Sequence, residues 1–212
     1  MTDLTTDDEK VEAIKKWWKA NGVSVIAGIA IGLGSVIGWR AWVNHNNSVS
    51  QRASIAFEQV LASTAAGAGE SAEKQAEILI DEYPGTPYTM FADLATAKVR
   101  VADGDLAGAA AALNSAIERA PDPGLATLAA LRLARVLIQS GEPDKAAALI
   151  DKYDDGGPFA ADFAALRGDI AAAEGNTDAA RTAYREAIDG GAGNARLLEL
   201  KLQDLPAASG TS

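Results

Sequence analysis

The chain has 212 residues and a formal net charge of −10 at pH 7, with 19 basic residues, 29 acidic residues and one histidine. An acidic balance of this size argues against a nucleic-acid partner, which would require a basic surface. The sequence contains no cysteine, which excludes disulfides and thiol chemistry. Ala, Leu, Asp, Glu and Arg dominate outside one apolar stretch, and this composition favours a helical domain over a sheet.

The apolar stretch begins at Val23 and reads VSVIAGIAIGLGSVIGW without a charge. With the residues up to Val43 it is long enough to cross a bilayer as a helix. Tryptophans flank it on both sides, as is typical at membrane interfaces: Trp17, Trp18, Trp39 and Trp42. We therefore expect a transmembrane helix over residues 23–43, with a buried helix of a soluble protein as the alternative. A cleaved signal peptide fits less well, because bulky residues follow the stretch where cleavage requires small ones.

The basic residues around the span predict its direction. Four lysines precede it, namely Lys10, Lys15, Lys16 and Lys19, and two arginines follow it closely, Arg40 and Arg52. Because basic residues are retained on the cytoplasmic side, we expect residues 1–22 in the cytoplasm and the rest of the chain on the far side.

The segment before the span has a helical pattern of its own. Thr6 and Glu9 have the spacing of a capping box, and a set of apolar residues falls on one side: Val11, Ile14, Trp17 and Trp18. Two interpretations remain open, a short helix lying on the inner leaflet and a few extra turns of the transmembrane helix.

Small residues mark one face of the span. Gly28, Gly32 and Ser35 share this face, and small residues about one turn apart let two helices approach closely in lipid. We expect helix pairing here; the alternative is the general tolerance of transmembrane helices for glycine.

The remainder of the chain, residues 44–206, contains repeats. The turn pairs Gly104-Asp105, Gly141-Glu142 and Gly175-Asn176 are 37 and 34 residues apart. Seven residues before each turn stands a small residue (Ala97, Ala134, Gly168), five after it an alanine (Ala109, Ala146, Ala180), and nine after it a large residue (Leu113, Ile150, Tyr184). Gly ends a first helix, and the Asp, Glu or Asn that follows starts a second one.

These units predict an all-α chain in which one transmembrane helix precedes an α-solenoid of helical hairpins, close to the tetratricopeptide (TPR) period. Arg100 and Arg167 depart from the pattern, because they occupy positions that are usually apolar. Residues 52–84 are expected to form a further unit, the helix near residues 194–206 to cap the stack, and residues 207–212 to form a flexible tail.

No catalytic or metal site is expected, and no cofactor. His45 lacks a neighbouring ligand cluster, and Asp154-Asp155 lies in a DDGGP turn without the spacing of a calcium loop. A binding surface on the first helix of each unit is the stronger expectation. The residues expected to line this peptide or partner groove are Phe91, Leu94, Lys98 and Val101 in one unit and Leu131, Arg135 and Ile138 in the next. Plain core packing of these residues is the alternative.

Three segments resemble a known family, the YfgM-like ancillary subunits of the bacterial SecYEG translocon. They are EAIKKWWKANGVSVIAGIAIGLGSVIGWRAW, GDIAAAEGNTDAARTAYREAI and LLELKLQDLP. The resemblance implies an inner-membrane, single-pass protein with a periplasmic TPR-like domain. It implies the SecYEG translocon and a membrane-anchored periplasmic chaperone related to prolyl isomerases (PpiD) as partners, and no catalytic residues.

The function expected from these observations is a non-enzymatic, membrane-tethered adaptor or chaperone that meets client polypeptides leaving the translocon. The alternatives are a regulator of envelope stress that sequesters a signalling protein, and a scaffold for an envelope or division complex.

Overall fold

The computed structural model describes residues 4–206, with side chains from Glu9 onward, so the expected tail at 207–212 lies outside the described residues. Over that range the chain is helical, with turns and no strand, which confirms the all-α prediction. The chain divides into two compact units, Met1–Val49 and Ser50–Ser212. The helices are α1 (Leu4–Ala65), α2 (Gly69–Glu82), α3 (Tyr88–Ala102), α4 (Leu106–Glu118), α5 (Pro123–Gln139), α6 (Pro143–Tyr153), α7 (Ala160–Ala173), α8 (Thr177–Asp189) and α9 (Ala195–Asp204).

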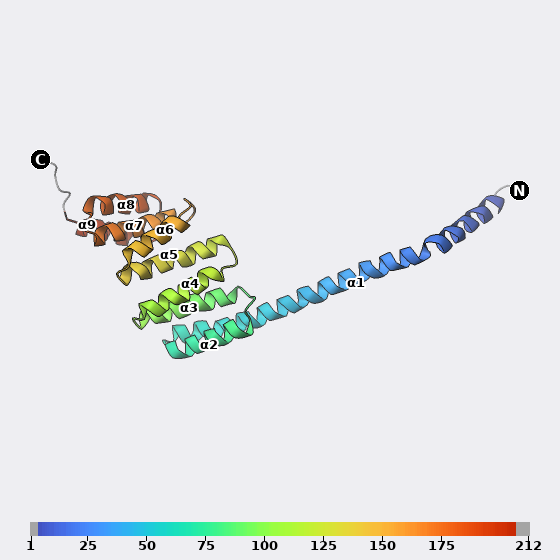
Figure 1. The fold of residues 1–212 in the computed structure, drawn as a ribbon, viewed down its shortest axis with the longest axis horizontal. Helices are drawn as coiled ribbons and strands as arrows, with labels where there is room; N and C mark the ends of the chain where they lie inside the picture. The colour runs from blue at the N-terminus through green and yellow to red at the C-terminus, as the bar shows by residue number, and fades with distance from the viewer. Residues whose placement is uncertain (1–3, 207–212) are drawn as a thin grey trace. The chain divides into compact units, whose positions relative to one another are not determined.

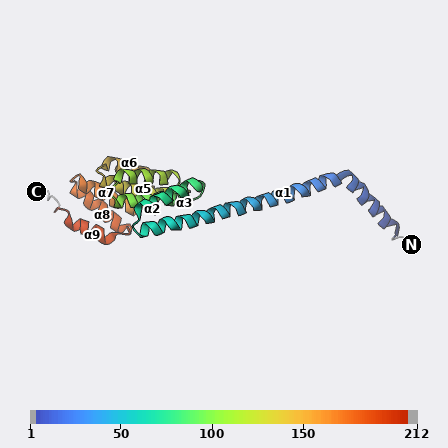
Figure 2. The ribbon, with the colours of Figure 1, turned by 90° about the horizontal axis from the view of Figure 1, so that it is seen from below.

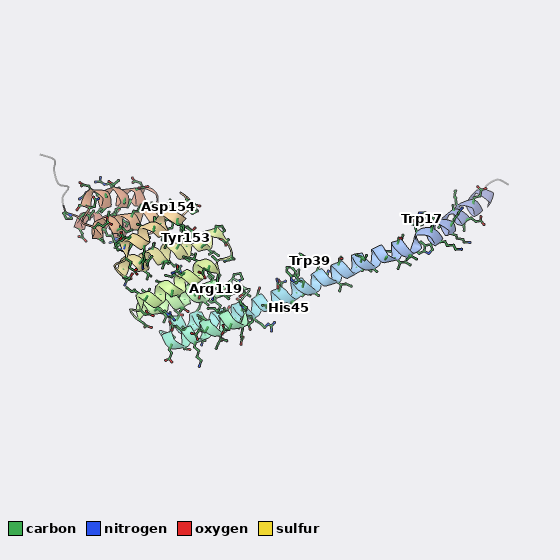
Figure 3. The ribbon with its side chains drawn as sticks, viewed as in Figure 1. Trp17, Trp39, His45, Arg119, Tyr153 and Asp154 are labelled. Carbon is green, nitrogen blue, oxygen red and sulfur yellow. The ribbon has the colours of Figure 1, made fainter. Side chains whose placement is uncertain are left out.

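Helix α1 carries the apolar span. Among the described residues it is the one helix long and apolar enough to cross a membrane, and only 6% of its most apolar window is buried. Figure 3 shows Trp17 and Trp39 at well-separated positions along this helix. The exposed span argues against a buried core helix of a soluble protein, because a core helix would cover its apolar side chains.

The N-terminal part of α1 bends, as Figure 2 shows. Gly22 is buried beneath Trp18, and a Cβ atom added at Gly22 would lie 3.3 Å from the Cε2 and Nε1 atoms of that indole. The side-chain amide of Asn21 donates a hydrogen bond of 3.1 Å to the backbone carbonyl of Trp17. Because α1 is a single helix from Leu4 to Ala65, both interpretations of the segment before the span, a surface helix and extra turns of the transmembrane helix, stay open.

The second unit is a stack of helical hairpins in chain order (Figure 1). The end of α1 packs against α2 and α3 through Val60, Leu79 and Ala92, so residues 52–84 do contribute a further hairpin. The pairs α3–α4, α5–α6 and α7–α8 follow, and α9 packs last. Helix α2 begins at Gly69, after a short turn that follows the end of α1 at Ala65. The absence of a side chain matters there: a Cβ atom at Gly69 would lie 2.9 Å from Val99.

The predicted turn glycines are confirmed by their backbone geometry. Gly104, Gly141 and Gly175 have φ values of 80°, 79° and 77°, a left-handed conformation that favours glycine. Asp105 and Asn176 then accept hydrogen bonds of 2.9 and 3.2 Å from backbone N–H groups in the first turns of α4 and α8.

The turn at Gly141-Glu142 differs from the prediction. Glu142 makes no such capping bond, and its carboxylate instead pairs with Lys145 and accepts a hydrogen bond from the Ser140 hydroxyl. The lysine and the hydroxyl hold the pKa of Glu142 below its ordinary value. Glutamate is one methylene longer than the usual capping residues, which explains why its carboxylate reaches these partners instead.

The repeat positions read from the sequence form the core of the stack. All nine are buried: Ala97, Ala134, Gly168, Ala109, Ala146, Ala180, Leu113, Ile150 and Tyr184. Small residues let the two helices of each hairpin approach, and the large residue fills the space between hairpins.

The two arginines that break the repeat pattern form ion pairs between elements. Arg100 of α3 lies 2.8 Å from Glu73 of α2, and Arg167 of α7 lies 2.7 Å from Asp154 in the preceding loop. These pairs explain how a charged residue occupies a position that is usually apolar, because each guanidinium has a partner on the neighbouring element.

Helix α9 covers the end of the stack. Leu198 is fully buried against α7 and α8, and Leu202 and Leu205 pack beside it. Asp169 of α7 joins the last helices, because its Oδ1 accepts hydrogen bonds from the Tyr184 hydroxyl (2.7 Å) and from Lys201 Nζ (2.6 Å).

Candidate binding groove and membrane span

A groove lies on the inner surface of the stack, between α1, α3 and α5, which are the first helices of three successive hairpins. Its main cavity has a volume of about 460 Å³. The lining residues are mostly apolar: Phe57, Leu61, Thr64, Ala65, Phe91, Leu94, Ala95, Lys98, Leu128 and Arg132. Because the first helices of stacked repeats form the concave face, the groove lies where a repeat protein ordinarily binds its partner.

Aromatic side chains form one wall of this groove. The ring of Phe57 lies 5.9 Å from the ring of Tyr88 and 5.9 Å from that of Phe91. Leu61, one turn further along α1, is 47% exposed. An apolar ligand would therefore meet a rigid aromatic surface and an uncovered leucine, and its burial would contribute roughly 25 cal/mol per Å² of apolar area.

A second cavity of about 340 Å³ adjoins the first and shares Leu94, Lys98 and Arg132 with it. Its remaining lining residues are the apolar Ala97, Val101 and Leu113. The two apolar cavities therefore meet at a pair of cations, one on α3 and one on α5.

The structure brings together the four residues expected from the first unit. Phe91, Leu94, Lys98 and Val101 all line one or both cavities. The three residues expected from the next unit lie elsewhere: Leu131 is 3% exposed inside the core, Ile138 packs half-buried against that core, and Arg135 lies 3.3 Å from Asp162 of α7.

Leu128 and Arg132 line the groove in place of these residues, about one helical turn earlier on α5. The prediction transferred positions from one unit to the next by aligning the turns. The groove lies between neighbouring first helices, so α3 contributes the side that faces α5, and α5 contributes the side that faces α3. These sides are not equivalent positions, and Arg135, which is equivalent to Lys98, faces α7. Leu133, Val136 and Leu137 of the same helix are buried as well.

The wall formed by α1 was not predicted as part of the groove. Phe57, Leu61 and Thr64 have the spacing of one helical face, which is the signal that could have identified it. That signal becomes informative only once the end of α1 is recognised as the first helix of a hairpin.

The cations that line the groove differ from the neighbouring cations in having no ion-pair partner. Lys98 and Arg132 are exposed, and neither forms an ion pair with any residue from 9 to 206. The other arginines of the same two helices are paired, Arg100 with Glu73 and Arg135 with Asp162. The unpaired cations are thus the two that face the groove, and they remain available to a ligand.

The predicted packing face of the span is open within the chain. A Cβ atom at Gly28 or Gly32 would meet nothing within 4 Å. The hydroxyl of Ser35 donates a hydrogen bond of 2.8 Å to the Ile31 carbonyl of its own helix. Ser35 is therefore a small residue whose hydroxyl needs no partner on another helix. Such a face permits close approach of another helix.

Within residues 9–206 no group of three or more His, Cys, Asp or Glu side chains could hold a metal ion. His45 is exposed on α1 (Figure 3). Asp154 and Asp155 accept hydrogen bonds from the backbone N–H groups of Gly156 and Gly157, as expected for residues that shape a turn.

Comparison with known proteins agrees with this geometry. The family model described as a tetratricopeptide repeat-like domain matches residues 15–207. Two curated proteins named "Ancillary SecYEG translocon subunit", from Haemophilus influenzae and Aggregatibacter actinomycetemcomitans, are 31% identical to the chain, and each match covers 94% of this chain and 97% of the relative. A third protein of that name, from Escherichia coli, is 31% identical over 86% of this chain and 87% of its own length.

The chain belongs to the family of ancillary SecYEG translocon subunits. The match to the family model, over residues 15–207, includes both the apolar span and the repeats. Together with the long apolar helix, this membership indicates a single-pass membrane protein with an adaptor domain.

Proposed function

We propose that this chain is a membrane-tethered adaptor of the Sec translocon, whose groove holds segments of newly translocated polypeptides. The observation that carries the proposal is the 31% identity, over most of the chain, to three proteins named as ancillary SecYEG translocon subunits. The apolar groove with unpaired cations supports a role in contacting client polypeptides, in the manner of a weak chaperone.

The proposed adaptor acts through contacts and not through catalysis. The carboxyl of Asp93 and the phenol of Tyr184, whose pKa values are both raised, are held in structural contacts with Arg119 and Asp169 and lie outside the groove. Burial raises the pKa of Asp93, and Arg119 opposes this rise.

The proposed location is the bacterial inner membrane, with the N-terminus in the cytoplasm and the repeat domain in the periplasm. The lysines before the span support this direction. The proposed partners are SecYEG itself and a membrane-anchored periplasmic chaperone of the PpiD type, which would receive clients beside the same channel.

The translocon contact is tested through the open face of the span. Replacing Gly28→Leu together with Gly32→Leu would place two isobutyl groups where another helix could approach. If this face packs against the translocon, the expected loss is about 1–2 kcal/mol, roughly a 5- to 30-fold weakening. The measurement is co-purification of SecYEG with the tagged chain from mild detergent, quantified by mass spectrometry.

The matched control is Gly34→Leu with Gly38→Leu, which adds the same volume to a different face of the span, where a Cβ atom also meets nothing within 4 Å. The control pair should co-purify as the unaltered chain does. A loss in the control alone would place the contact on that other face. Loss in neither variant would point to the repeat domain as the docking surface.

A further inference from the structure

The groove combines two apolar cavities with one charged junction. The larger cavity presents Phe57, Phe91 and Leu128, and the smaller presents Val101 and Leu113. Lys98 and Arg132 line both, so the cations stand between the two apolar spaces. A ligand that fills both cavities must pass the cations with its middle part.

The charges near this junction are positive. No acidic side chain from residues 9–206 lines either cavity, although Asp103 lines a separate space of about 100 Å³ that also reaches Lys98. The chain as a whole carries a net charge of −10. At physiological salt, charges more than about 8 Å away are largely screened, so the local cations and not the net charge decide what the groove attracts.

We propose that the groove selects polypeptide segments in which one carboxylate lies between two bulky apolar side chains. This inference rests on the proposed function, which has the groove hold polypeptide. The apolar side chains fill the two cavities and supply most of the affinity. The carboxylate accepts charge-assisted hydrogen bonds from Lys98 and Arg132, which gives the selectivity.

The other segment types fit the groove less well. A segment with a lysine in the middle would place a third cation beside two unpaired ones, and like charges in one site repel. A segment with a neutral amide in the middle keeps the apolar contacts and loses only the charge-assisted hydrogen bonds to Lys98 and Arg132. The ordering of affinities among the three types therefore reports on the cations alone.

The test uses the full chain in nanodiscs of zwitterionic lipid, which have no net charge to attract a basic peptide. Three fluorescein-labelled synthetic peptides share their two apolar residues and carry aspartate, asparagine or lysine between them. Binding is followed by fluorescence anisotropy. Because ion pairs at exposed sites are weak, the aspartate peptide should bind roughly three- to tenfold tighter than the asparagine peptide, and the lysine peptide weakest.

Variants separate the two cations from the rest of the groove. Lys98→Gln with Arg132→Gln should bind the aspartate and asparagine peptides equally, and Lys98→Glu with Arg132→Glu should prefer the lysine peptide. The matched control is Arg135→Gln, which removes a cation of the same helix that is paired with Asp162. It should keep the preference of the unaltered chain. The circular dichroism signal and melting temperature of each variant verify folding.

Equal affinity of the unaltered chain for the aspartate and asparagine peptides would overturn the inference, and so would a preference that survives the double glutamine variant. Failure of all three peptides to bind would overturn it as well. Co-purification of SecYEG with the same variants distinguishes this result from failure of the proposed function. If co-purification persists while the preference is absent, only the selectivity of the groove is wrong.

Discussion

Gly168 of α7 illustrates how a single residue sets the distance between two helices. A Cβ atom at this position would lie 2.4 Å from the Cδ1 and Cε1 atoms of Tyr184 on α8. The tyrosine cannot move away easily, because the residue is 2% exposed and its hydroxyl donates a hydrogen bond to Asp169. The small residue predicted from the repeat pattern is therefore required by a specific neighbour.

Replacing Gly168→Ala should destabilise the repeat domain. The clash is expected to cost about 1–3 kcal/mol, partly offset by the higher helix propensity of alanine, about 1 kcal/mol. The measurement is guanidinium unfolding of the full chain in detergent, followed by circular dichroism. In a Tyr184→Leu background the same change should cost less. An equal cost in both backgrounds would contradict the clash, and Gly193→Ala, where a Cβ atom meets nothing within 4 Å, is the control.

Tyr184 also makes the stability of the folded repeat domain depend on pH in the alkaline range. Burial raises its pKa well above the ordinary value, and the Asp169 carboxylate raises it further. The folded state therefore holds this proton more tightly than the unfolded state does. The resulting stability is fully present below the ordinary tyrosine pKa of about 10 and is lost as pH rises above it.

Tyr184→Phe should remove this alkaline dependence and, at neutral pH, lower the free energy of unfolding by about 1 kcal/mol through the lost hydrogen bond. Asp169 would keep its pairing with Lys201. Absorbance titration of the chain's four tyrosines should lose its last phase in this variant. The same late phase in both proteins would show that Tyr184 titrates ordinarily.

At the scale of elements, the N-terminal part of α1 presents two faces. Val11, Ile14, Trp17 and Trp18 are between 47% and 66% exposed and lie on one side. Lys15, Lys16 and Lys19 lie on the other side of the helix. Near the bend of α1, this pattern is typical of a helix that lies in the membrane interface.

Spin labels can test this placement, because the chain has no cysteine of its own. Single cysteines at Val11, Glu12, Ile14 and Lys16 would be labelled in nanodiscs and probed with oxygen and a water-soluble nickel complex. We expect lipid exposure at Val11 and Ile14 and water exposure at Glu12 and Lys16, since a surface helix immerses one face. Water exposure at all four positions would instead indicate extra turns of the transmembrane helix that project from the bilayer.

At the scale of the whole molecule, the direction of the span decides what the groove can meet. Protease added to spheroplasts should digest the repeat domain and leave the N-terminal segment intact, because the lysines before the span retain that segment in the cytoplasm. The products are identified with antibodies to tags at each end. Protection of the repeat domain until the membrane is permeabilised would reverse the proposed topology and remove the periplasmic clients from the proposal.

The repeat pattern predicted the hairpins and their core, because small and large residues at fixed distances from a turn determine how two adjacent helices pack. The turn glycines were equally readable, since a left-handed backbone requires them locally. The partners of Arg100 and Arg167 were not predicted. These arginines pair with residues of a neighbouring element, and no local pattern indicates such a pair.

The sequence by itself determined a helix long and apolar enough to span a membrane, followed by helical hairpins. Apolar length and residue spacing are local properties that can be read from each helix separately. Only the tertiary structure decided which residues line the groove. Arg132 lines the groove, whereas Arg135 forms an ion pair with Asp162, although the two arginines lie about one helical turn apart on α5. That choice depends on which side of α5 faces α3 and which faces α7, and this is set by the packing of whole helices together.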